Sequence, residues 1–161
     1  MNITASDLIV LTHAVFGVLG GLAALWVFIE ALNARPENAR RIRVAAAVTA
    51  LSMTAAWILG GYWYVNFYPA EKALILKGPW PAAHNLFMET KEHLFFATLI
   101  LSFYLPIAAA ENLYKNRTAR RMVLSVTMLI FLTGLGIEGA GAVISHGAKI
   151  ALAKAVVKGT K

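Results

Sequence analysis

Four long apolar runs divide the chain, and polar or charged stretches separate them. The runs cover residues of about 8–30, 43–65, 90–112 and 120–145. Each has close to the roughly 20 residues that an α-helix needs to cross a hydrocarbon core about 30 Å thick. The pattern therefore predicts a single all-α membrane domain over residues 1–161 with four transmembrane helices.

The connections between these runs are short, apart from the loop expected over residues 67–80. Short connections place consecutive helices antiparallel, so the sequence predicts an up-down-up-down four-helix bundle. Thr4 and Asp7 are typical capping residues for the start of the first helix, and Pro36 suits the first turn of the second. The aromatic residues around the 67–80 loop are typical of a bilayer interface.

Residues 147–161 follow the last run and are basic. Their lysines, at positions 149, 154, 158 and 161, lie mainly on one side of a helix. This pattern predicts a C-terminal amphipathic segment that lies on the membrane surface.

Composition and charge predict how these spans are oriented in the membrane. The chain is 59% hydrophobic and 14% charged, against an average of about 25% charged residues in soluble domains. All seven arginines and Lys115 lie in the first and third connections. By the positive-inside rule these connections face the cytoplasm of a bacterial-type inner membrane, and both termini face outward. Basic residues between apolar runs are topology signals, so no nucleic-acid partner is expected.

The titratable residues form a layer near the outer boundary. His13, His93 and Glu138 lie equally far along the chain, to within one position, from the cytoplasmic edges of their helices. At a rise of about 1.5 Å per residue, all three are about 26 Å above that edge. Gly60 lies at the same level on the second helix. Ionisable groups at this depth are candidates for function by default.

Two of these residues suggest haem binding. The first and third helices of such a bundle lie diagonally, about 13 Å apart, which is the space that two imidazoles and a porphyrin fill. The four spans and the two positions His13 and His93 resemble the small four-helix membrane cytochromes b. The resemblance implies a b-type haem between these histidines, and Gly17, Gly20 and Gly21 leave space for its ring or allow close helix packing.

Two alternatives stay open. Glu89 and His93 share a helical face, and His13, Glu138 or His146 could complete a site for a zinc, copper or iron ion. The same groups could also only hydrogen-bond between helices, in a structural subunit of a larger membrane complex. The absence of cysteine excludes disulfides, thiolate metal sites and covalent haem attachment.

Glu138 is a candidate proton acceptor, for a quinol among other substrates. His84 falls on the opposite side of a continuous helix from His93 and is expected to be an interfacial or surface residue. Together the patterns predict a haem b electron-transfer or accessory subunit of a respiratory complex. It would be linked to quinone and surrounded by lipid and other subunits, rather than act as an independent enzyme.

Overall fold

The computed structural model describes residues 4–159, and no strand occurs in this part of the chain. Four of its helices are long and apolar enough to cross a membrane, those over Ala5–Leu32, Pro36–Asn66, Ala83–Ala109 and Arg117–Val157. The prediction of an all-helical chain with four helices suited to spanning a membrane is confirmed, and it is consistent with a multi-pass membrane protein.

Short helices join the long ones. The elements in chain order are α1 (Ala5–Leu32), η1 (Pro36–Asn38), α2 (Ala39–Asn66), α3 (Tyr68–Lys77), the π-helical segment η2 (Ala83–Met88), α4 (Glu89–Ala109) and α5 (Arg117–Gly159). The predicted cap of α1 is confirmed, because Thr4 and Asp7 each bond the other's backbone N–H.

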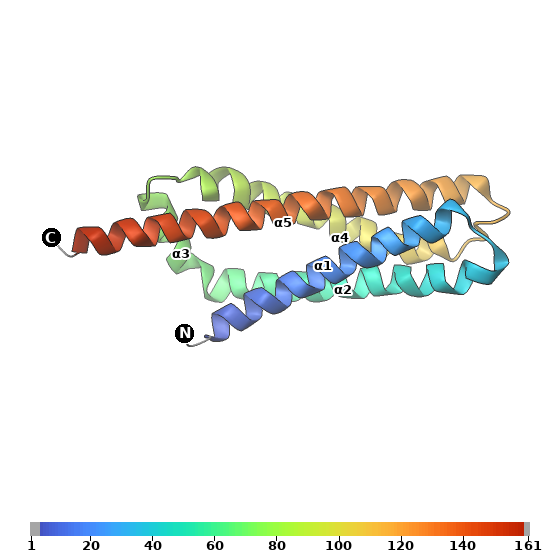
Figure 1. The fold of residues 1–161 in the computed structure, drawn as a ribbon, viewed down its shortest axis with the longest axis horizontal. Helices are drawn as coiled ribbons and strands as arrows, with labels where there is room; N and C mark the ends of the chain where they lie inside the picture. Colours follow the sequence, from blue (N-terminus) through green and yellow to red (C-terminus); the bar gives the residue numbers. More distant parts are fainter. Residues whose placement is uncertain (1–3, 160–161) are drawn as a thin grey trace.

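The long helices pack in a ring of contacts. Helix α1 packs against α2 and α5, and α4 packs against the same two helices. Helices α1 and α4 therefore lie at opposite corners. Figure 1 shows that α1 runs obliquely to α2 along the molecule.

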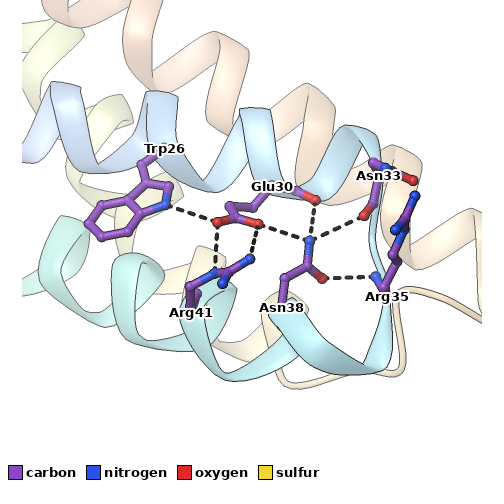
Figure 2. A network of polar contacts seen from close by, with 6 residues as sticks. All are labelled: Trp26, Glu30, Asn33, Arg35, Asn38 and Arg41. Carbon is purple, nitrogen blue, oxygen red and sulfur yellow. Dashed lines mark hydrogen bonds and ion pairs between the residues drawn. The ribbon is translucent and has the colours of Figure 1, made fainter.

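We call one end of the molecule the arginine end, because the connections of residues 33–38 and 110–116 lie there among the seven arginines. Figure 2 shows the polar network that closes its first turn. The Glu30 carboxylate accepts hydrogen bonds from Arg41 Nε and Nη2 at 2.9 and 3.2 Å, from Trp26 Nε1 at 3.3 Å and from Asn38 Nδ2 at 2.9 Å. Both carboxylate oxygens are thus occupied, and α1 is fixed to the first turns of α2.

We call the opposite end the cap end, and one prediction about it was wrong. Residues 68–77, expected as part of a loop, form helix α3. Tyr68 and Ile75 are each 1% exposed and face the interior. They are seven positions apart and therefore lie on the same face of the helix. Pro69 fits at the first helical turn, where its missing N–H leaves no bond unmade.

A second correction concerns the C-terminal segment. Helix α5 continues without a break through Gly159 instead of ending near residue 145. Its later turns pack against α3 and η2. Gly147 and Ala151 contact Ala83 and Gly78, so small residues on both sides allow close approach. The end of the predicted basic segment, Lys161, lies outside the described residues.

Two apolar clusters form the core. The larger, at the arginine end, joins α1, α2, α4 and α5, and the smaller lies beneath α3 and includes Tyr68, Ile75, Ala83, Met88 and Ile144. Along α4 the clusters leave a gap between Met88 and Leu99, and along α5 between Ile130 and Ile144. The ionisable side chains of the candidate site lie in this gap.

Candidate functional site

Three ionisable side chains from three helices occupy the gap between the apolar clusters. They are His13 of α1, Lys91 of α4 and Glu138 of α5, and we call them the ionisable cluster. His13 is within electrostatic range of both Lys91 and Glu138. Lys91 is likewise within range of Glu138, and also of Glu92.

The imidazole of His13 is fixed against α2. Its Nδ1 lies 2.7 Å from the backbone oxygen of Ala56. A carbonyl oxygen only accepts, so Nδ1 carries the proton and donates it, and Nε2 is left as an acceptor. One turn further along α2, a Cβ on Gly60 would lie 2.7 Å from His13 Cε1. The ring therefore fills the space that the glycine leaves.

Glu138 reaches toward α1 in a similar way. A Cβ on Gly17 would lie 2.8 Å from Glu138 Oε1, which is closer than real Cβ contacts come. The side chain of Glu138 nevertheless remains exposed on the surface of its helix. Its carboxylate therefore lies against a glycine of α1 and is open to the surroundings of the bundle.

Lys91 completes the pattern. A Cβ on Gly141 of α5 would lie 3.3 Å from the Lys91 Nζ atom. Each member of the ionisable cluster thus occupies space left by one glycine on a neighbouring helix: Gly60 for His13, Gly17 for Glu138 and Gly141 for Lys91. This arrangement admits a charged or polar head group where a larger residue would exclude it.

The structure does not bring His13 and His93 together. His93 is exposed, and its Nδ1 donates to the backbone oxygen of Glu89 on its own helix at 2.7 Å. The expectation that both imidazoles face inward is wrong for His93, because the helical level of a residue does not fix the side on which it lies. A porphyrin between these rings does not fit, since His13 is packed against Gly60 and His93 faces outward.

His84, expected at the surface, is instead the buried histidine of the cap end. It is 3% exposed, and a hydrogen bond of 3.1 Å joins its Nδ1 to Tyr68 Oη. Its Nε2 lies 3.7 Å from Glu89 Oε1, beyond hydrogen-bond distance.

The outward position of His93 explains this correction. His84 lies nine positions before His93, on the opposite side of an α-helix, and the two residues keep opposite sides although residues 83–88 form a π-helical turn. Because His93 is exposed, the side that carries His84 is the one that faces the interior, and Tyr68 of α3 contacts His84 there.

The remaining predicted site residues have other surroundings. Glu89 is about half exposed, and its Oε1 lies 3.7 Å from His84 Nε2. His146 is exposed, two turns beyond Glu138. Gly20 makes room for the buried Met53, and Gly21 has open space beside it. Among residues 4–159, no group of three or more His, Cys, Asp or Glu side chains is arranged to hold a metal ion.

Burial raises the pKa of the Tyr68 hydroxyl, with smaller contributions from Tyr64 and Glu71. Folded Tyr68 therefore keeps its proton above pH about 10, where an unfolded tyrosine loses it. The stability that Tyr68 contributes is fully present below that pH and is lost as the pH rises further.

We expect Tyr68→Phe to make the protein less stable at pH 8 by about 1–3 kcal/mol, because the buried His84 Nδ1 is left without its hydrogen-bond partner. We also expect the free energy of unfolding of the variant to fall less steeply between pH 9 and 11 than that of the unaltered protein. Thermal unfolding in detergent across this range measures both effects. Tyr114→Phe, at an exposed tyrosine, is the control; equal pH dependence in all three proteins would contradict the assignment.

Sequence reasoning missed two parts of this arrangement. Sequence position alone puts Lys91 at the outer mouth of its helix, although its ammonium lies against Gly141. It puts Tyr68 in an interfacial belt, although this side chain is buried. The sequence did contain one indication of the position of Lys91. Gly141 lies one turn from Glu138 on the same face of α5 and leaves space there for a side chain from a neighbouring helix.

No protein-family model, curated protein or solved structure matches this chain. What the protein does is therefore inferred from its own residues, and above all from the ionisable cluster.

Proposed function

We propose that the protein is a quinone-binding accessory subunit of a respiratory-type membrane complex, in which Glu138 receives the proton of a quinol hydroxyl. One observation carries the proposal: the Glu138 carboxylate is exposed on a helix long and apolar enough to span a membrane, and Lys91 and His13 lie within electrostatic range of it. Ionisable groups within membrane helices mark proton relays and substrate pathways.

The surroundings of Glu138 suit a flat, lipid-soluble ring. Gly134 lies one turn away on the same face of α5, and a Cβ there would have open space around it. A ring resting on this face would place a hydroxyl next to the carboxylate. When a redox group of a partner subunit takes the two electrons, both hydroxyl O–H bonds of the quinol break; one proton passes to a Glu138 oxygen and the other to water at the second hydroxyl.

The neighbouring groups support this role. Lys91 places a positive charge within electrostatic range of Glu138. His13 Nε2 is an unprotonated acceptor at the same level, and the proton would pass to it from Glu138. In this proposal the chain supplies the groups that bind and transfer protons, and the partner subunit accepts the electrons.

Saturable binding of a short-tailed benzoquinone tests the proposal. We expect the quinone to quench tryptophan fluorescence of the purified protein with a defined Kd. Glu138→Gln should weaken the binding of the corresponding quinol about tenfold or more, since a hydrogen bond to a charged group contributes about 1.5–3 kcal/mol. Glu111→Gln, at the exposed arginine end, should bind like the unaltered protein.

Two results would contradict the proposal. Quenching that never saturates, or that is equal in all three proteins, would leave a structural subunit without a quinone site. A Soret band in the same preparation would show a bound haem if His13→Ala removed that band. The outward position of His93 argues against this result.

We further propose that the four helices form an up-down-up-down bundle in a bacterial-type inner membrane, with both termini outside. The chain contains no cysteine, so single cysteines report topology directly. We expect Lys149→Cys to react with an impermeant maleimide in intact cells and Lys115→Cys to react only after lysis. The reverse pattern would invert the orientation.

A further inference from the structure

We propose that the groove between α1 and α2 at the arginine end binds one anionic phospholipid, with its phosphate at Arg40 and Arg41 and one acyl chain along the groove. This site is separate from the ionisable cluster and does not depend on the quinone proposal. It lies on the outer surface of the helix pair whose turn Figure 2 shows.

The groove has the shape and polarity of a lipid site. It encloses about 470 Å³ and has nine lining residues: Leu19, Leu22, Ala23, Trp26, Arg40, Arg41, Val44, Ala45 and Val48. Seven of these are apolar, and the two arginines are neighbours at one end. Leu22, Trp26 and Val44 are each more than half exposed, so the walls are open to the membrane.

The length of the groove matches one leaflet. From Glu30, at the level of the arginines, to Leu19 is 11 residues of α1, or about 16 Å. Half of a hydrocarbon core is about 15 Å. An acyl chain that starts beside the arginines would therefore reach the middle of the bilayer at Leu19.

The charges at the open end favour an anionic head group. Glu30 neutralises Arg41 through two hydrogen bonds and holds its guanidinium in place. Arg40 is exposed, and among residues 4–159 no ion pair engages it. One positive charge is thus left uncompensated, beside a second arginine that is already oriented. Trp26, fixed to Glu30 by its Nε1 at 3.3 Å, lies at the level where tryptophan favours the membrane interface.

The lining also argues against a second protein helix. Helix pairs in membranes meet through glycine, alanine and serine, which allow close backbone approach. Here branched side chains and an indole form the walls, with only Ala23 and Ala45 as small residues. A free phosphate ion would leave the apolar length of the groove unused.

Native mass spectrometry of the detergent-purified protein tests the site, with phosphatidylglycerol and phosphatidylcholine of identical acyl chains as probes. We expect one phosphatidylglycerol to be retained about fivefold more tightly than phosphatidylcholine, the effect of one arginine near an anionic lipid. Arg40→Gln should abolish this preference. Arg117→Gln removes an exposed charge of the same end outside the groove and should keep it.

Leu22→Trp fills the groove and should weaken the retention of both lipids, with helix content unchanged by circular dichroism. Inorganic phosphate at millimolar concentration should not displace the lipid. The proposal is overturned if the two lipids bind equally, if Arg117→Gln lowers the preference as much as Arg40→Gln does, or if phosphate alone occupies the site and displaces the lipid.

Discussion

Gly60→Ala is expected to destabilise the protein by about 1–3 kcal/mol, the usual range for an added methylene group in a packed interior. A methyl group at this position would lie 2.7 Å from Cε1 and 2.8 Å from Nδ1 of His13. Since Nδ1 is held at 2.7 Å from the Ala56 oxygen, the ring can move away only by breaking that hydrogen bond. The thermal midpoint in a fixed detergent measures the loss.

The adjacent glycine provides a matched control. A Cβ on Gly61 has open space around it, so Gly61→Ala should change stability by only a few tenths of a kcal/mol, within the range of a surface substitution. The two variants differ by one position and have the same composition. Equal effects would show that His13 does not depend on the space at Gly60.

The second large effect is expected at Lys91. Lys91→Met removes the positive charge behind Glu138 and leaves a carboxylate in the membrane without its counter-charge. We expect a loss of about 1–2 kcal/mol, because an ionisable group on a membrane helix is costly without a partner. The Lys91→Met/Glu138→Gln double variant should recover most of this loss, and the two changes should couple by a similar amount.

Unfolding in mixed micelles, followed for both single variants and the double variant, gives the coupling energy. Lys115→Met, at an exposed lysine of the arginine end, should be neutral both alone and combined with Glu138→Gln. Additive effects of Lys91→Met and Glu138→Gln would mean that the two groups do not interact.

Hydropathy and helix rise account for the part of the architecture that could be predicted from sequence. The four spans follow from apolar length alone. The common level of His13, Gly60 and Glu138 follows from the constant rise per residue of an α-helix. His13 lies against Gly60, which was placed at the same level, and Glu138 lies against Gly17, about one turn further in. His93, placed at that level as well, is exposed instead.

The facing of each residue was harder to predict. Lys91 and His93 are two positions apart on α4, which puts them on nearly opposite sides of the helix, and only Lys91 faces α5. Which of the two turns inward depends on how α4 is rotated, and a uniformly apolar helix surface does not reveal that rotation. His84 and His93 do lie on opposite sides, as expected, but the interior is on the side of His84. Nothing in the sequence of residues 83–88 indicates their π-helical turn.

Helix α5 is longer than the hydrocarbon core of a bilayer is thick. Between Arg121 and Lys154 it runs for 33 residues, or about 50 Å at the rise of an α-helix, while the hydrocarbon core is only about 30 Å thick. Its last turns therefore extend beyond the bilayer as a rigid rod, braced by α3 and η2. A domain or partner attached near Lys154 would be held at a defined height above the lipid, with the helix acting as a molecular ruler.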